Sequence, residues 1–234
     1  MVQGVAEVVP VSSSAQLVLL PWLLGWQPPA DRTGFAAGLH AGSCVGIAAV
    51  VGRPDRRTAV LVAATSVPAA VAGLLAADRV EARLGRPPQL AALLAGAGAL
   101  LWAVDRWSPQ DRQVGGREAA YAAAAQVAAL VPGVSRSGAT LTALRLAGVE
   151  RSAAQRFSLL MSLPVTAGAA GLTLARNRSL TPQTVLGAGT AALAGAAAAG
   201  TVSRRGGDSA ALAAAYRLGL AVIVARHLRR KGPA

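Results

Sequence analysis

The chain has 234 residues, of which 53% are hydrophobic and 14% are charged, with a mean hydropathy of +0.47 and a net charge of +13. The single cysteine, Cys44, excludes an intrachain disulfide and a thiolate metal cluster. In a soluble protein the positive charge would suggest nucleic-acid binding, but 22 of the 23 basic residues are arginines spread over short loops and termini, so we expect membrane lipids and no nucleic acid as partners.

The apolar residues gather in runs of about 17–23 between arginine-rich loops, the length that a bilayer-spanning helix needs. We therefore predict an all-α polytopic membrane protein that forms one integral membrane domain over residues 1–234. The alternative is a soluble alanine-rich bundle, which would carry polar residues at every helical turn. The run 59–77 contains only Thr65 and Ser66 as polar residues, which favours the membrane protein.

A hydroxyl-rich break lies at the start of the chain. The apolar run 1–9 ends at Pro10, serines follow at positions 12, 13 and 14, and an apolar run resumes over 17–24. Neither run is long enough to span a bilayer, so we predict a re-entrant hairpin over 1–24, a form tolerated at membrane depth only where it lines a protein cavity. Glu7, in its first arm, is the only acidic residue within an apolar stretch.

Three spans are expected next, at about 34–52, 58–77 and 89–104, with a charged loop at 78–88 before the third. Small residues in the first of these spans, such as Gly42 and Gly46, allow helix backbones to approach closely in lipid. A loop over 105–118 then leads to the second half of the chain.

A second break interrupts the apolar stretch 119–148 with the sequence Pro132-Gly133-Val134-Ser135-Arg136-Ser137-Gly138-Ala139-Thr140. An arginine so deep in apolar sequence is costly without a partner. A helix restarting after the break has free N–H groups at its N-terminus, and these groups, the guanidinium and the hydroxyls would form a site for a phosphate-like anion. The alternative is a loop between two helices that places Arg136 at the water interface.

The two breaks indicate an internal repeat, because 11–15 can be aligned on 134–138 as one hydroxyl-rich pattern. Three further spans are expected after the second break, at about 153–175, 182–202 and 209–225. Since three spans separate the breaks, the second hairpin would enter from the opposite side of the membrane. We therefore predict an inverted-topology repeat with halves 1–117 and 118–234, in which the broken helices meet and bring Glu7 to Arg136. Basic residues are divided almost equally between the two sides, so the orientation stays open.

At these motifs the sequence resembles the undecaprenyl pyrophosphate phosphatase family of bacterial inner membranes, the bacitracin-resistance type. The second break matches the family's pattern along its whole length. The first break matches it at Gln3-Gly4, Glu7, Pro10 and the three serines. Residues 153–158, Leu163-Pro164 and Tyr216-Arg217 also look like the family. The resemblance implies a helical fold with two re-entrant hairpins in an inverted repeat.

The resemblance further implies a reaction and a location. Members of the family remove the terminal phosphate from undecaprenyl diphosphate, which recycles the lipid carrier of cell-wall precursors. For this chain it implies a polyprenyl diphosphate lipid as substrate, a divalent cation such as Mg or Ca, and a site open to the outer face of the bacterial inner membrane. A second copy of the chain, forming a homodimer, is a further candidate partner.

Two positions depart from the family pattern. Gln3 stands where the family usually has the first of two glutamates, and Gln16 stands where it usually has a histidine. Because glutamine cannot accept a proton at neutral pH, the role of general base assigned to that histidine is vacant. His40 is the only other histidine inside the apolar region. It would take this role if its span passes the site; otherwise it is a packed or hydrogen-bonded histidine.

The candidate catalytic residues are Glu7, Ser13 and Arg136. Arg136 would clamp phosphate oxygens, Glu7 would be the metal ligand, and Ser13 stands at the family's candidate nucleophile position, with attack by metal-bound water as the alternative. Ser14 would cap the following helix, and Arg217 would meet the second phosphate or a helix carbonyl. The candidate substrate-binding residues are Gln3, Ser12, Gln16, Gly133, Ser135, Ser137, Thr140 and Arg217.

Three functions are compatible with this pattern. The first is an integral membrane phosphatase acting on undecaprenyl diphosphate. The second is a non-hydrolytic lipid-phosphate binder or transporter, since inverted repeats with broken helices are common in transporters. The third is an inactive paralogue or one whose true start lies upstream of Met1. We favour the enzyme because Glu7, Ser13 and the whole second break are present.

Overall fold

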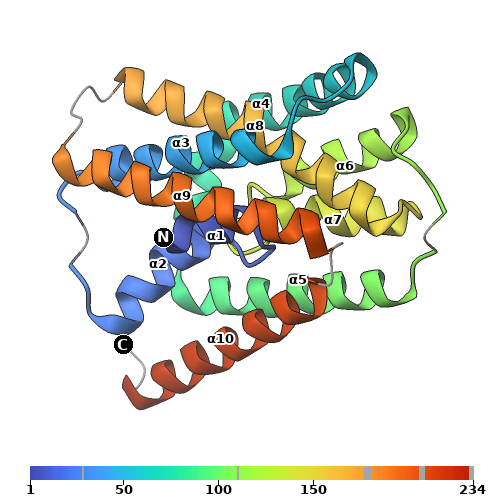
Figure 1. The fold of residues 1–234 in the computed structure, drawn as a ribbon. Helices are drawn as coiled ribbons and strands as arrows, with labels where there is room; N and C mark the ends of the chain where they lie inside the picture. Colours follow the sequence, from blue (N-terminus) through green and yellow to red (C-terminus); the bar gives the residue numbers. More distant parts are fainter. Residues whose placement is uncertain (28, 110, 177–180, 206–208, 232–234) are drawn as a thin grey trace.

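The computed structural model describes residues 1–27, 29–109, 111–176, 181–205 and 209–231. Within these ranges the regular structure is α-helical, apart from one isolated bridge between Arg112 and Val149 (Figure 1). The helices are α1 (Val2–Val8), α2 (Ser13–Leu24), α3 (Arg32–Val51), α4 (Arg56–Leu84), α5 (Pro87–Trp107), α6 (Gly116–Ala128), α7 (Arg136–Leu146), α8 (Arg151–Arg176), α9 (Pro182–Arg205) and α10 (Ser209–Lys231).

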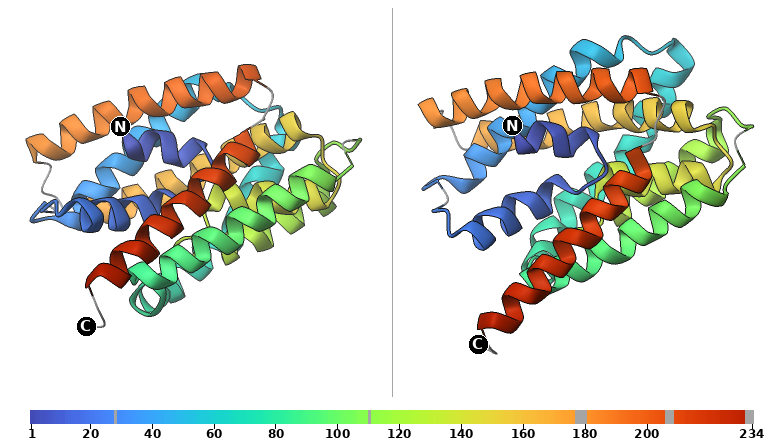
Figure 2. Two further views of the ribbon diagram at one scale, coloured as in Figure 1. Left: turned by 90° about the horizontal axis from the view of Figure 1, so that it is seen from below. Right: turned by 60° about the horizontal axis from the view of Figure 1, so that its bottom comes forward.

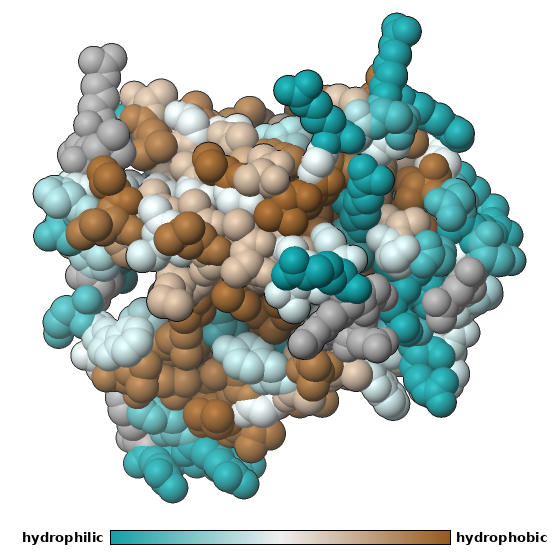
Figure 3. Space-filling view, viewed as in Figure 1, coloured by the Kyte–Doolittle hydropathy of each residue, from teal (hydrophilic) through white to brown (hydrophobic). Residues whose placement is uncertain are grey.

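Six helices are long and apolar enough to cross a membrane, namely α3, α4, α5, α8, α9 and α10. The all-α, multi-pass prediction and the number of spans are therefore confirmed. The space-filling view shows the same division, because hydrophobic residues cover much of the face around α9 whereas hydrophilic residues gather at the right-hand end, where α4, α6 and α8 begin (Figure 3).

The prediction of a loop over 78–88 is wrong for most of these residues. Helix α4 continues to Leu84, and α5 begins at Pro87. The residues from 78 to 84 are charged, but they are mostly alanine, glutamate, arginine and leucine, which are good helix formers. The helix ends only at Gly85, ahead of the proline at which α5 begins.

At its N-terminus α4 is capped by Asp55, whose carboxylate accepts a hydrogen bond from the Thr58 amide. The hydrogen bonds from the Thr58 hydroxyl and amide lower the pKa of Asp55.

The order of helix lengths repeats, with two short helices followed by three long ones in each half. The two breaks share an uncommon backbone conformation, because Ser12 and Ser135 are the only non-glycine residues with positive φ in the described ranges, at 68° and 72°. In each break this serine faces the one two positions later, at 3.3 Å for Ser12 to Ser14 and 3.2 Å for Ser135 to Ser137 (Oγ to Oγ). The alignment of 11–15 on 134–138 thus corresponds to equivalent local geometry, while the direction of each hairpin through a membrane stays a prediction.

The short helices lie among the long ones (Figures 1 and 2). Helix α1 packs against α3 and α9, and α7 packs against α5, α6 and α8. One hydrophobic cluster joins α1, α3, α6, α7, α8 and α9, with buried residues such as Val8 of α1, Ile47 of α3 and Phe157 of α8. This packing brings the start of α7 to the end of α1.

Helices α3 and α9 approach closely along a glycine face. A Cβ atom added to Gly42 would collide with the backbone of Ala188, and one added to Gly46 would collide with that of Ala192. Gly4 of α1 meets α9 in the same way, at the backbone of Ala191. The expectation that small residues bring these backbones together is confirmed, and the contact fixes α1 against two spans.

Candidate active site

Glu7 and Arg136 meet where the two breaks come together. The side chains lie 129 residues apart in the sequence, and Arg136 Nη2 donates to Glu7 Oε1 at 2.8 Å. Glu7 is the penultimate residue of α1, and Arg136 is the first residue of α7, which Ser135 caps by accepting from the Gly138 amide at 3.2 Å. Each charge is mostly buried, so each neutralises the other at a depth where neither would be stable alone.

Further polar groups surround this ion pair. Gln3 Nε2 donates to Glu7 Oε2 at 2.9 Å and lies 3.0 Å from His40 Nδ1, while that nitrogen lies 3.4 Å from Glu7 Oε2. On the other side, Arg136 Nη1 donates to the Ser158 carbonyl at 3.2 Å. The carboxylate and the guanidinium are therefore oriented by contacts from α1, α3 and α8, as a preorganised charge site requires.

The ion pair forms part of the wall of a cavity of about 200 Å³. The polar lining consists of Glu7, Ser12, Ser13, Ser14, His40, Gln126, Ser135, Arg136 and Thr166. Helices α4 and α8 and the turn after α6 add an apolar side that includes Ala69, Val165 and Leu130. The volume corresponds to roughly six water molecules, so the cavity has room for a small polar headgroup but none for a long hydrocarbon chain.

The remaining predicted site residues lie behind the cavity wall rather than in it. Gln16 donates to the Val11 carbonyl at 3.0 Å and accepts from the Tyr216 hydroxyl at 2.8 Å. Arg217 is fully buried and donates through Nη2 to the Val134 carbonyl at 2.7 Å. Adjacent residues of α10 thus hold the first and the second break in place, and substrate contacts for Gln16 and Arg217 stay predictions.

The second break is held together by its own side chains. Thr140 Oγ1 lies 2.7 Å from Ser158 Oγ and donates to the Arg136 carbonyl, while Ser137 is buried against Ser135. Gly133 adopts a φ of 93°, a conformation that favours glycine. In this structure Gly133, Ser137 and Thr140 shape the turn that presents Arg136, and these three residues do not line the cavity.

Some cavity residues were not predicted as such. Ser14 was expected to cap the following helix, but Ser12 holds the N-cap position of α2, and both serines line the cavity. Gln126 was missed, although it is the only strongly polar side chain between 122 and 131; its Oε1 is buried and has no hydrogen-bond partner among the described residues. Thr166 could not have been identified as a cavity residue from the sequence, because a single threonine is common in a membrane span. The alternative for Arg136, a loop at the water interface, is wrong because the side chain is mostly buried against Glu7.

A cation in this cavity would have few charged ligands. Within the described ranges, no group of three His, Cys, Asp or Glu side chains could hold a metal ion. Glu7 provides one carboxylate, and Gln126 Oε1 is a neutral oxygen that still lacks a partner. Hard cations such as Mg²⁺ and Ca²⁺ take oxygen ligands, so these residues fit part of a coordination shell.

Similarity to other proteins covers the whole fold. The family described as Bacitracin resistance protein BacA matches residues 1–223. An undecaprenyl-diphosphatase of Gemmatimonas aurantiaca is 42% identical over 192 residues, which cover 72% of this chain and 71% of the relative. The undecaprenyl-diphosphatase of Pelotomaculum thermopropionicum is 37% identical, with 99% of this chain and 96% of the relative covered. That of Moorella thermoacetica is 38% identical, with 74% and 73% covered.

Proposed function

The chain belongs to the BacA family, and we propose from this premise that it is an undecaprenyl-diphosphatase of the bacterial inner membrane. It removes the terminal phosphate of undecaprenyl diphosphate and so recycles the lipid carrier of cell-wall precursors. The observation that carries the proposal is the Glu7–Arg136 pair in a hydroxyl-lined cavity among membrane-spanning helices. A non-hydrolytic binder would have no need of the buried carboxylate beside its anion site.

Substrate binding follows from the shape and charge of the cavity. The diphosphate takes the place of Glu7 as a partner of Arg136, with the hydroxyls of Ser13, Ser14 and Ser135 around its oxygens. The prenyl chain does not fit in about 200 Å³. It leaves past the apolar side formed by α4, α8 and the turn after α6, into the bilayer.

The chemistry requires a nucleophile and a base. Ser13 attacks the terminal phosphorus, the lipid monophosphate leaves, and water then releases the phosphate from the serine; direct attack by water is the alternative. We assign the role of base to His40, because it lines the same cavity while Gln16 is turned away. In its neutral form the imidazole has one unprotonated ring nitrogen, and that nitrogen takes the proton of the nucleophile.

A divalent cation is part of the proposal. Glu7 and Gln126 Oε1 would hold it together with oxygens of the substrate, and its charge would neutralise the developing negative charge on the phosphate. Because the protein supplies one carboxylate, cation binding and substrate binding reinforce one another. We further propose that the site opens to the outer side of the membrane, as the family resemblance implies.

Phosphate release by the purified chain in detergent tests the function. We expect release from undecaprenyl diphosphate with Mg²⁺, none with EDTA, and a loss of about 100-fold or more in Arg136→Ala and Glu7→Gln. Arg106→Ala, which removes an exposed arginine of α5, is the matched control and should keep full activity. Substrate binding that depends on Arg136 without any phosphate release would instead identify a lipid-phosphate binder or transporter.

A further inference from the structure

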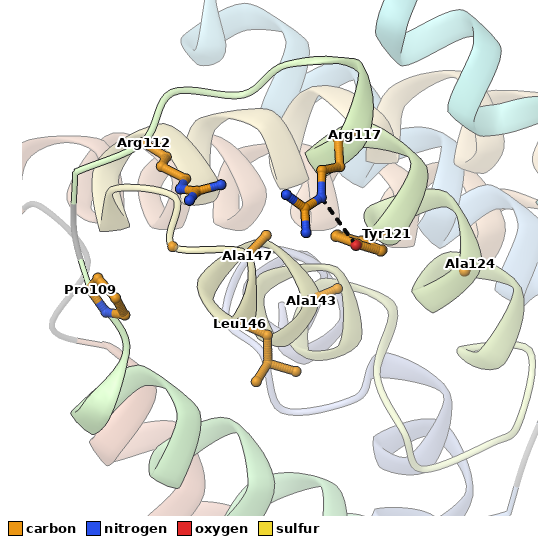
Figure 4. A pocket seen from close by; sticks show the side chains of 9 residues that line it. Pro109, Arg112, Arg117, Tyr121, Ala124, Ala143, Leu146 and Ala147 are labelled. Carbon is orange, nitrogen blue, oxygen red and sulfur yellow. Dashed lines mark hydrogen bonds between the residues drawn. The ribbon is translucent and has the colours of Figure 1, made fainter.

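A second, larger hollow of about 570 Å³ lies away from the active site, between the start of α6, the end of α7 and the loop that precedes α6 (Figure 4). Arg112 of the loop and Arg117 of α6 stand on one side of it, and Tyr121 lies next to Arg117. Leu146 and Ala143 of α7 line it opposite these groups. The hollow thus combines cationic groups with an apolar side.

Both arginines keep most of their capacity for hydrogen bonding. Arg117 is exposed and donates through Nε to the Tyr121 hydroxyl at 3.2 Å, with its guanidinium carbon 5.6 Å from the centre of that ring. The Arg112 side chain is about half exposed, and its Nη1 forms an ion pair with Glu118 Oε1 at 4.0 Å, which is beyond hydrogen-bonding distance. Since no acidic side chain of the described residues lines the hollow, its charge is complementary to an anion.

The backbone holds Arg112 in place. Its N–H donates to the Gly148 carbonyl at 3.1 Å, and its carbonyl accepts from the Glu150 amide at 2.9 Å. Because these bonds tie the loop before α6 to the turn after α7, the two arginines stand on a fixed framework rather than on a free tail.

The position of the hollow points to the membrane interface. Two spans have one terminus beside the hollow, because α5 ends at Trp107 and α8 begins at Arg151. Trp102 and Trp107 of α5 are exposed and form an edge-to-face pair with ring centres 5.7 Å apart. Tryptophans in this setting mark the level of lipid headgroups. Leu146 and Tyr121, which line the hollow, remain 64% and 45% exposed. They would therefore face lipid rather than protein.

We propose that this hollow binds one anionic phospholipid. The phosphodiester lies between Arg112 and Arg117, and an acyl chain runs past Leu146 and Ala143 toward Ala124, which lies about two turns into α6. The occupant is a lipid rather than a free phosphate because an anion alone would leave the exposed apolar side uncovered. The site is separate from the cavity of Glu7 and Arg136 and from the proposed catalysis.

Native mass spectrometry of the purified full chain, released from neutral detergent, tests this site. The chain is titrated with phosphatidylglycerol, with phosphatidylcholine of the same chains, and with phosphatidylglycerol in excess inorganic phosphate. Arg112→Gln/Arg117→Gln is compared with Arg53→Gln/Arg57→Gln, which removes two exposed arginines from the loop between α3 and α4 and from the start of α4. Circular dichroism confirms that both variants remain helical.

We expect the first phosphatidylglycerol to bind about tenfold more weakly to Arg112→Gln/Arg117→Gln and less than about twofold more weakly to the control. Phosphatidylcholine should bind about tenfold more weakly than phosphatidylglycerol to the unmodified chain. Equal losses in the two double variants, or none in the first, would overturn the site. Displacement of the lipid by phosphate alone would show a headgroup-free anion site, and equal binding of the two lipids would show an apolar groove; either result contradicts the proposal.

Discussion

Tyr216 and Arg217 are neighbours on α10, yet each holds a different break. The tyrosine hydroxyl reaches Gln16 behind the first, and the arginine reaches the Val134 carbonyl behind the second. A Cβ atom on Gly138 would lie only 3.2 Å from the Arg217 guanidinium, so the arginine also packs directly against the start of α7. These contacts make Arg217 a positioning residue for Arg136.

Arg217→Met should lower kcat about tenfold and leave KM nearly unchanged, because it removes the donor to the Val134 carbonyl while filling similar space. Arg217→Lys retains a donor and should restore part of kcat. Steady-state kinetics with undecaprenyl diphosphate separate the two parameters. If Arg217 contacts the second phosphate, as the sequence allowed, KM would rise instead.

His40→Ala should lower kcat by about 100-fold or more, the usual range for loss of a general base. Steady-state phosphate release from undecaprenyl diphosphate measures this loss. The matched control is His227→Ala, which removes a histidine that packs on Trp22 outside the site. A His40→Ala variant that keeps the kcat of the unmodified chain would exclude His40 as the base.

At the scale of the elements, the contact between α3 and α9 fixes the position of α1. Gly42 and Gly46 of α3 face the backbone of α9. Gly4 of α1 faces the backbone of the same helix at Ala191. Helix α9 therefore packs against both the span that carries His40 and the short helix that carries Glu7. Close packing here decides whether the imidazole reaches the carboxylate.

Gly42→Val should destabilise the protein by about 1–3 kcal/mol, because the added side chain forces α3 away from α9. Gly189→Val is the matched control on α9, since no atom lies within 4 Å of a Cβ added there. Thermal unfolding in detergent compares the two variants. Equal losses of stability in the two variants would mean that valine destabilises any of these helices, and that the interface between α3 and α9 is not the cause.

At the scale of the whole molecule, the two halves repeat one order of helices, short, short, long, long, long. The repeated serine geometry at 12–14 and 135–137 supports a common origin of the two breaks in one structural unit. With three spans between the hairpins, the halves are predicted to enter the membrane from opposite sides.

Labelling of single cysteines tests this topology. In a Cys44→Ala background, Arg53→Cys and Asp111→Cys should react with an impermeant maleimide from one side of the membrane, and Arg86→Cys from the other. The reason is that one span, α4, lies between residues 53 and 86, and another, α5, lies between 86 and 111. Labelling of all three from the same side would contradict six spans in this order.

The sequence by itself determined the membrane class, the six spans and the two breaks. These features are local: the length of an apolar run decides whether a helix spans, and proline, glycine and serine decide where it stops. The repeat, and with it the meeting of Glu7 and Arg136, also followed from the sequence, because a buried arginine and a buried glutamate need one another. Where helix formers outweighed charge, as between 78 and 84, the local prediction was wrong.

Only the tertiary structure decided which polar side chains face the cavity. Each residue turns a helix by about 100°, so the packing of α2 directs Gln16 to Tyr216 while Ser13 and Ser14 reach the cavity. Packing of α3 on α9 likewise decided that His40 lies beside Glu7 rather than in an ordinary helix interface. The orientation of a helix about its axis depends on all its neighbours at once, and that information is not local in the chain.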